Sequence, residues 1–383
     1  MDPLSLGVIA TYRKPDERRL AIHPEHLPDI PEDLRRRIFL ERGYGREFGI
    51  DDRQLEPLVA GLRTRDELSR ECDIVVLPKP LAADLADLRP GQVLWGWPHC
   101  VQDAAMTQAA IDGRLTLIAW EAMNHWDAQG GFSHHVFHEN NAMAGYCSVL
   151  HALQLGGVTG AYGRRLRAAV ISFGATARGA VTGLSALGVD DVTVFTHREV
   201  DAVDSPFPWV RMRHFARDAG RPGRAVLPGA DGEDDRSLTA ALAGYDVIVN
   251  CILQDTDAPL LFVMDDDLGS FRPGTLFVDV SCDEGMGFEW ARPTSFADPV
   301  FTVGDNLRYY AVDHSPSFLW NSATWVNSRA LLEYLPTVMA GPEAWDADET
   351  IRRAIEIRDG HIQNPRILSF QQRAPAFPHE VLA

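Results

Sequence analysis

Short apolar runs recur along the chain and are separated by longer segments of mixed polarity. Two runs lie in the first hundred residues and each reaches a proline, and four more lie between residues 167 and 280. They are Cys72–Pro80, Val93–Cys100, Arg167–Phe173, Asp191–Thr196, Tyr245–Leu253 and Thr275–Val280. Apolar runs of strand length are typical of strands buried on both faces of a parallel sheet. The pattern predicts an α/β fold with doubly wound parallel sheets.

The segments between the runs divide into helix and loop. Asn140–Gly157 combines an Asn cap, apolar residues at helical spacing and a Gly-Gly stop, which predicts a long helix connecting two domains. Gly220–Arg236 is rich in Gly, Pro and acidic residues, which predicts an exposed loop. The 383 residues are enough for two domains with substantial cores.

Charge and composition limit the partners. The chain has 36 Lys and Arg against 54 Asp and Glu, and its net charge of −18 repels nucleic acid and anionic lipid. No apolar run approaches the roughly 18 residues of a membrane span, and the N-terminus lacks the charged-then-apolar order of a secretory signal. We therefore expect a cytoplasmic protein with no nucleic-acid or membrane partner. The five scattered cysteines favour reduced core residues.

The stretch VISFGATARGA, at Val170 to Ala180, follows an apolar run and opens a helical segment that ends near Gly188. This is the context of a dinucleotide-binding fingerprint, although Ser172 stands where the first glycine is usual. Gly174 would allow close backbone approach to a pyrophosphate, and Gly179 would serve close helix–strand packing. An ordinary strand-turn-helix with small residues is the alternative interpretation.

The next apolar run ends in FTHRE, which bears on the choice of nucleotide. An acidic residue at this point usually receives the ribose hydroxyls of NAD, whereas basic residues receive the extra phosphate of NADP. His197 and Arg198 stand there, so the sequence favours NADPH over NADH, with Arg198 as the phosphate partner. Glu199 is the competing ribose ligand.

Ionisable residues also end the two apolar runs of the first half. Lys79 follows VVLP and His99 follows LWGWP. A lysine that emerges from an apolar strand can exchange protons near neutral pH, as a histidine can without perturbation. Arg19, in DERRLAIHP, can bind a carboxylate through two parallel hydrogen bonds. Each residue taken singly has a commoner structural role. Lys79 could extend its ammonium from the apolar strand to water, His99 could be a hydrogen-bonded core residue, and Arg19 could form a surface ion pair.

Together the motifs resemble a known enzyme superfamily. They are ERRLAIHPEH, CDIVVLPKP, WGWPHCVQ, LIAWEAM, NNAMAGYCSVLHAL, ATARGA, YDVIVNCI, GTLFVDVSCDEG and SPS, and they run from about Gly7 to about Leu335. The superfamily is that of alanine dehydrogenase, transhydrogenase and lysine-forming saccharopine dehydrogenase, and the motifs are most similar to its N5-(carboxyethyl)ornithine synthase branch. The resemblance implies two Rossmann-like domains. Residues 1–139 with 311–383 would form the substrate domain, to which the C-terminal region returns, and residues 140–310 the dinucleotide-binding domain.

The resemblance also implies a reaction and assigns roles. Pyruvate, or a similar 2-oxo acid, would condense with the side-chain amine of ornithine or a similar diamino acid, and NADPH would reduce the imine. Arg19 would bind the oxo-acid carboxylate, Lys79 and His99 would transfer protons, and Asp283 would lie near the nicotinamide. The pyrophosphate would be bound by Ser172, Gly174, Thr176, Ala177 and Arg178. The nicotinamide ribose would lie along Cys251, Ile252 and Leu253.

Three departures from the family pattern concern the substrate. Ala142 replaces an acidic residue in NNAMAG, Glu139 stands where a basic residue is favoured, and His314 stands where asparagine is usual. We expect Glu139 to face the cleft and pair with a cationic amine. The identity of the amine substrate is therefore left open, and it need not be ornithine.

Other functions remain open at this point. The main alternative is oxidation of an amino acid of the alanine dehydrogenase or saccharopine dehydrogenase type. A transhydrogenase subunit that passes hydride to a membrane partner is disfavoured by the lysine–histidine pair. A zinc module could use His134, His135 and His138, since four-residue spacing places two histidines on one helical face, but a second ligand pair is lacking. We expect no metal, and a homo-oligomer that acts on small-molecule substrates.

Overall fold

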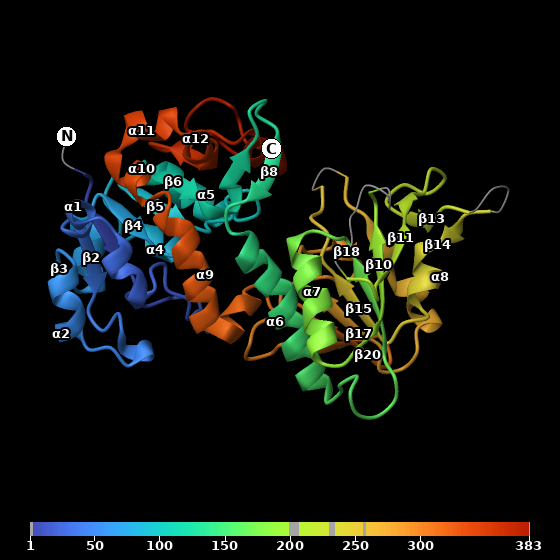
Figure 1. Cartoon of the computed structure of the whole chain (residues 1–383). Helices are drawn as coiled ribbons and strands as arrows, with labels where there is room; N and C mark the ends of the chain where they lie inside the picture. The colour runs from blue at the N-terminus through green and yellow to red at the C-terminus, as the bar shows by residue number, and fades with distance from the viewer. Residues whose placement is uncertain (1–2, 199–206, 230–233, 256–257, 383) are drawn as a thin grey trace. The chain divides into compact units, whose positions relative to one another are not determined.

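The computed structural model describes residues 3–198, 207–229, 234–255 and 258–382 (Figure 1). The chain forms two compact units, residues 1–138 with 319–383 and residues 139–318. Residues 311–318 accordingly lie in the second unit. Each unit has its own sheet and its own core.

An eight-stranded sheet forms the centre of the first unit, in the order β22-β21-β6-β5-β4-β1-β2-β3. Strands β1 to β6 are parallel to one another, and their order is that of a Rossmann fold. From β1 the chain adds β2 and β3 on one side of the sheet, and then β4, β5 and β6 on the other side. The strands are β1 (Leu6–Val8), β2 (Ile38–Glu41), β3 (Gly61–Arg63), β4 (Ile74–Val76), β5 (Val93–Gly96), β6 (Thr116–Ala119), β21 (Ile355–Arg358) and β22 (His361–Ile362).

The helices of this unit cover both faces of the sheet. Ile74 and Val76 pack into one core and Val75 and Leu77 into another, which is why the apolar run of β4 shows no polar alternation. The helices are α1 (Glu32–Arg35), α2 (Asp52–Leu55), α3 (Arg65–Glu71), α4 (Ala82–Leu85), α5 (Ala104–Asp112), α9 (Trp320–Leu332), α10 (Leu335–Ala340), α11 (Pro342–Ala347), α12 (Glu349–Ala354) and α13 (Pro365–Phe370). A separate hairpin joins β7 (Asn124–Trp126) and β8 (Phe132–His135).

The C-terminal region returns to the first unit, as expected. Strand β21 pairs antiparallel with β6, and helices α10 to α12, orange to red in Figure 1, lie beside the N-terminal strands. The last residues pack there too: the buried Arg373 donates to Gln108 Oε1 at 2.8 Å and to the His379 carbonyl at 3.1 Å. The tail is thus part of this unit's own structure.

The second unit contains a seven-stranded sheet in the order β11-β10-β9-β15-β17-β20-β19, again of Rossmann type. All neighbours are parallel except β19 and β20. Its strands are β9 (Arg167–Ile171), β10 (Asp191–Thr196), β11 (Arg211–His214), β15 (Val247–Asn250), β17 (Leu276–Asp279), β19 (Val300–Val303) and β20 (Leu307–Tyr310). Two Rossmann-like, doubly wound sheets were predicted, and the prediction is confirmed.

Helices and short strands complete the second unit. The helices are α6 (His138–Gly156), α7 (Ala175–Ala186) and α8 (Leu238–Leu242). The short strands are β12 (Ala216–Arg217), β13 (Ala225–Leu227), β14 (Arg236–Ser237), β16 (Leu261–Val263) and β18 (Gly287–Phe288). Figure 1 shows α6 and α7 side by side.

Two local predictions were wrong. Helix α6 begins at His138, so Asn140 lies inside it and does not cap it. The buried side chains of Val136 and Phe137 anchor the chain just before that point, and the helix starts directly after them. The second error is the expected loop at Gly220–Arg236, which contains the buried strand β13, because its apolar residues pack into the core among the turn residues.

Candidate active site

Lys79 and His99 meet at the carboxyl edge of the first unit's sheet. They follow the neighbouring strands β4 and β5, and Lys79 Nζ lies 2.8 Å from His99 Nε2. Gly96 makes this approach possible, since a Cβ atom there would lie 2.0 Å from the Leu77 carbonyl oxygen. His99 itself adopts a φ of 49°, a strained conformation of the kind found at functional sites. The two groups are close enough to exchange a proton directly.

Glu121 joins this pair from the end of β6 and was not among the residues expected from the sequence. Its Oε1 accepts the backbone N–H of His99 at 2.6 Å, and its Oε2 is buried without a hydrogen-bond partner among the described residues. Burial and the nearby Glu356 carboxylate raise the pKa of Glu121 to about 8, although the Lys79 ammonium acts in the opposite direction. Near neutral pH this carboxyl group is therefore largely protonated and can donate a proton.

The raised pKa of Glu121 makes stability depend on pH. The folded chain holds the neutral carboxyl, whereas the unfolded chain ionises it above its ordinary pKa of about 4.5. The resulting stabilisation is complete below that value and is lost as the pH rises through about 8. We expect Glu121→Gln, which cannot ionise, to raise the thermal unfolding midpoint relative to the wild type by an amount that grows from pH 5 to pH 8.

Unfolding scans of both proteins at pH 5, 6.5 and 8 measure this difference. Glu32→Gln is the matched control, because Glu32 is exposed and its hydrogen bond and ion pair with Arg36 lower its pKa. If the difference between the Glu121→Gln and wild-type unfolding midpoints is the same at every pH, the Glu121 carboxyl is not neutral in the folded chain.

Arg19 is buried beside a carboxylate that the sequence pattern did not reveal. Its Nε and Nη2 donate to Glu17 Oε1 and Oε2 at 2.9 and 2.6 Å, and both side chains are almost completely buried. The guanidinium also lies 5.0 Å from the ring centroid of Trp97, two residues before His99. Glu17 and Trp97 together fix the plane of the Arg19 guanidinium, which suits it to orient a planar anion.

The expected pyrophosphate loop lies between β9 and α7 in the second unit. Ser172 has a φ of 85°, the conformation that the usual first glycine adopts without strain. Gly174 is the N-cap of α7, no side chain caps it, and a Cβ there would meet nothing within 4 Å. The first turn of α7, with Thr176 and Ala177, therefore presents backbone N–H groups toward open space, as an anion site requires.

Two further observations concern this loop. Arg178 stacks on the ring of Phe173 at 4.2 Å, which holds its side chain against the turn. Gly179 packs against a helix rather than a strand, because its Cβ would lie 1.7 Å from the Ala142 carbonyl oxygen of α6. The predicted close packing at Gly179 is present, but the prediction of a strand as the packing partner was wrong.

A group of basic side chains surrounds the end of β10. His197 and Arg198 are exposed there. Burial lowers the pKa of His197, and the positive charges of Arg198, His214 and Arg217 lower it further. The competing acid, Glu199, lies outside the described residues. Arg198 and Arg217 therefore place positive charge beside His197 at the end of this strand.

The ends of β15 and β17 complete this edge of the sheet. Cys251 and Ile252 are buried after β15, whereas Leu253 is 92% exposed and offers an apolar contact surface. At the last residue of β17, the Asp279 carboxylate accepts hydrogen bonds from Tyr309 Oη at 2.7 Å and from Asn250 Nδ2 at 3.0 Å. The loop beyond carries Asp283, whose pKa is raised to about 6 by burial.

The structure thus gathers the predicted residues into two groups. Arg19, Lys79 and His99 belong to the first unit, and the fingerprint residues, Cys251–Leu253 and Asp283 belong to the second. Glu139 is exposed on the first turn of α6. Glu17 and Glu121 were missed, although Glu121 had a visible signal: it is the third ionisable residue in succession to follow a parallel strand.

Similarity to known proteins agrees with this architecture. Residues 7–133 match the alanine dehydrogenase/PNT N-terminal domain, and residues 151–365 match its C-terminal domain. The chain belongs to the alanine dehydrogenase/PNT family. The family resemblance predicted from the motifs is confirmed, and the match extends thirty residues beyond Leu335, where the predicted resemblance ends. The chain is an NAD(P)-dependent oxidoreductase, and its amino-acid dehydrogenase relatives act on CH–NH bonds.

Two named activities occur among the curated relatives. An N(5)-(carboxyethyl)ornithine synthase of Clostridium botulinum is 22% identical over 332 residues, which cover 84% of this chain and 90% of the relative. An alanine dehydrogenase of Mycobacterium tuberculosis is 25% identical over 338 residues, covering 85% of each. Among solved structures, an L-alanine dehydrogenase has a TM-score of 0.72 at 19% identity, with 96% of this chain and 99% of that chain covered. That likeness shows the shared fold.

The remaining predictions concern cysteines, metals and membranes. Four of the five cysteines are buried, as expected for core residues, and Cys282 is half-buried. His134 and His135 lie on strand β8, so the helical spacing invoked for a zinc site was wrong. Within the described ranges, no three His, Cys, Asp or Glu side chains are placed to hold a metal ion. The same part of the chain contains no helix with the length and apolarity to span a bilayer.

Proposed function

We propose that this enzyme catalyses the NADPH-dependent reductive condensation of a small 2-oxo acid, such as pyruvate, with the side-chain amine of a diamino acid such as ornithine. The product is an N-(carboxyalkyl) amino acid. The observation that carries the proposal is the 2.8 Å contact between Lys79 Nζ and His99 Nε2, beside the half-buried carboxyl of Glu121. Three groups that can exchange protons thus lie at one edge of a sheet.

This reaction needs protons at several steps. The amine attacks the C2 carbonyl of the oxo acid, the adduct loses its hydroxyl as water, and a C=N bond forms. Bound NADPH supplies the hydride that reduces the C=N carbon, which yields the secondary amine. In the proposal, Lys79 and His99 take the proton released by the amine and deliver one to the departing hydroxyl. Arg19, held by Glu17, binds the oxo-acid carboxylate, and Asp283 lies near the nicotinamide in the second unit.

The choice of lysine at position 79 supports a proton-transfer role. The chain contains only two lysines, Lys14 and Lys79, so 34 of its 36 Lys and Arg residues are arginine. An arginine does not lose its proton in a protein, whereas a lysine can. A lysine beside His99 therefore supplies a group that titrates.

NADPH is proposed as the cofactor because Arg198 and Arg217 concentrate positive charge near His197 at the end of β10. We expect Arg198→Ala to weaken NADPH binding by about 1–3 kcal/mol through loss of a charge-assisted contact, with NADH binding almost unchanged. Fluorescence titration with both cofactors measures the preference. Arg211→Ala is the matched control, since Arg211 pairs with Asp191 at the opposite end of β10. Equal loss of NADH and NADPH affinity in Arg198→Ala would contradict the phosphate contact.

A second candidate is an alanine dehydrogenase-type reaction, in which ammonia replaces the diamino acid. The 25% identity to the Mycobacterium tuberculosis enzyme favours it. The two candidates differ in the size and charge of the amine. In the first, the exposed Glu139 carboxylate is proposed to attract the second charged group of the diamino acid.

Mass spectrometry of the reaction mixture distinguishes the candidates. Wild-type enzyme with NADPH and pyruvate is incubated with ornithine, lysine or ammonia, and the products are identified. We expect a secondary-amine adduct of a diamino acid to form faster than alanine. If alanine forms faster than any adduct, the synthase proposal is wrong and the dehydrogenase proposal replaces it.

A further inference from the structure

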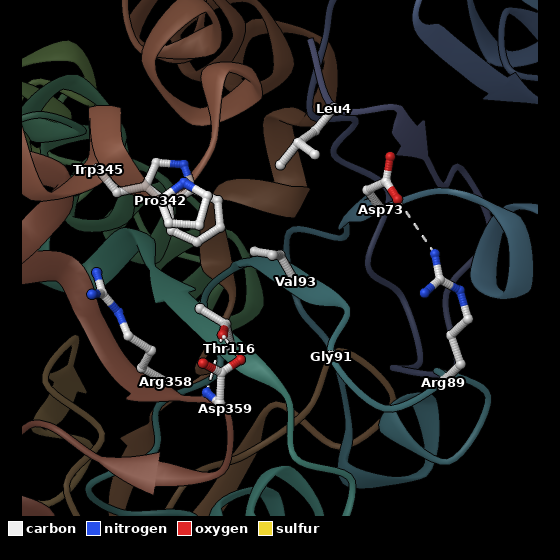
Figure 2. A pocket seen from close by; sticks show the side chains of 10 residues that line it. All are labelled: Leu4, Asp73, Arg89, Gly91, Val93, Thr116, Pro342, Trp345, Arg358 and Asp359. Atoms are coloured by element: carbon white, nitrogen blue, oxygen red, sulfur yellow. Dashed lines mark hydrogen bonds and ion pairs between the residues drawn. The ribbon is translucent and has the colours of Figure 1, made fainter. Parts of the chain in front are cut away.

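A cavity of about 350 Å³ lies at the amino edge of the first unit's sheet, opposite the edge that carries Lys79 and His99. Asp73 precedes β4, Val93 begins β5 and Thr116 begins β6, and all three line it (Figure 2). The volume lies within the range of small-molecule sites. Because strand direction separates the two edges, the cavity is distinct from the catalytic groups.

Charges of both signs line this cavity in equal number. Figure 2 shows Arg89 and Arg358 on opposite sides, with Asp73 near the first and Asp359 below the second. Asp73 is already engaged, because it accepts hydrogen bonds from the Ser5 backbone and hydroxyl at 2.9 and 2.7 Å. The Asp359 carboxylate accepts only a long contact of 3.5 Å, from the Thr116 hydroxyl, among the described residues. Asp359 is therefore the acid best placed for a ligand.

A tight hairpin turn holds Arg358 and Asp359 in place. Asp359 and Gly360 have φ values of 50° and 82°, as in the two-residue turns that favour Asp-Gly. A side chain at position 360 would approach the Ile111 carbonyl oxygen to 2.9 Å, which shows how closely this turn is seated. The two charged side chains are thus presented from a rigid backbone.

The remaining wall of the cavity is apolar. Leu4, Val93, Pro342 and Trp345 contribute to it. Trp345 donates its indole N–H to the Val338 carbonyl at 2.8 Å, which fixes the ring. A ligand that fits must therefore have an apolar part as well as polar ends.

We propose that this cavity binds a free amino acid with an apolar side chain. Arg358 Nη2 already donates to the exposed Asp346 carboxylate at 2.7 Å, so the ligand carboxylate binds the remaining N–H groups of that guanidinium. The ligand ammonium pairs with Asp359, and its side chain packs on Trp345. An inorganic anion would meet the repulsion of Asp73 and Asp359, and a simple cation that of the two arginines. A zwitterion is complementary to both signs of charge.

Isothermal titration calorimetry with L-leucine tests the proposal. L-leucinamide lacks the carboxylate and 4-methylpentanoate lacks the amine, so each should bind at least about tenfold more weakly, as expected for a lost charge-assisted contact. Arg358→Gln and Asp359→Asn should weaken L-leucine binding to the same degree. Asn tolerates the left-handed conformation, so Asp359→Asn keeps the turn if the first variant fails to fold.

Two controls separate this site from the catalytic one. Arg352→Gln removes an exposed arginine of the same unit, on α12 and outside the cavity lining, and should leave L-leucine binding unchanged. Lys79→Met should abolish turnover but leave L-leucine binding unchanged. The proposal is overturned if L-leucine does not bind, if inorganic phosphate or L-leucinamide binds as tightly, or if Asp359→Asn binds L-leucine like the wild type.

Discussion

Lys79→Met and His99→Ala are each expected to lower turnover by at least about 100-fold, because general acid–base groups contribute on that order. The 2.8 Å contact between the two side chains makes either one insufficient without the other. Both residues belong to the first unit and the fingerprint loop belongs to the second, so NADPH affinity should be almost unchanged. Steady-state kinetics and cofactor titration measure the two effects.

Lys79→Arg sharpens this test. The substitution keeps a positive charge but removes a proton that can be transferred. Turnover should fall about as far as in Lys79→Met, with NADPH affinity again serving as the control. Wild-type-like turnover in Lys79→Arg would mean that the charge, and not proton transfer, is what the enzyme needs at this position.

Gly179→Ala is expected to destabilise the protein by about 3 kcal/mol or more, which exceeds most overpacking effects. Its Cβ would lie 1.7 Å from the Ala142 carbonyl oxygen, and both contacting segments are helical backbone that cannot rotate aside. The opposing Gly145 is equally constrained, because its Cβ would lie 1.9 Å from the Thr176 carbonyl oxygen. Helices α6 and α7 can therefore pack backbone to backbone only because Gly145 and Gly179 lack a Cβ atom. Denaturant unfolding measures the loss.

Gly174→Ala is the matched control, five residues earlier in the same segment. Its Cβ meets nothing within 4 Å and its φ is negative, so stability should be close to that of the wild type. NADPH affinity should instead fall roughly tenfold or more, since the methyl group occupies the space into which the pyrophosphate would come. Unchanged NADPH affinity in Gly174→Ala would contradict the proposed loop, whatever the result for Gly179→Ala.

Much of the fold could be predicted because buried parallel strands leave a local signal. Each run such as CDIVVLPKP is apolar without alternation, since its strand is covered on both faces. The errors came where a tertiary contact overrode the local pattern. Val136 and Phe137 enter the core and start α6 early, and β13 is a short apolar strand among Gly and Pro residues that read as a loop.

The candidate site shows the same division. Lys79 and His99 could be proposed together because each ends an apolar run, and parallel strands bring such ends together. Glu17 was missed because DERR is typical of a solvated surface, and its burial becomes visible only with Trp97 and Arg19 in place. Ser172 was read as a missing glycine, whereas the fold holds it in the glycine-like conformation.

The sequence by itself determined the strand-helix alternation, the position of the glycine-containing turn between β9 and α7 and the chemical types at the strand ends, because these depend on residues close together in the chain. Only the tertiary structure decided the contact between Lys79 and His99, the raised pKa of Glu121 and the helix contact at Gly179. Each depends on atoms from strands or helices that are separated in sequence. Desolvation and backbone approach arise only when those elements pack, so no local pattern encodes them.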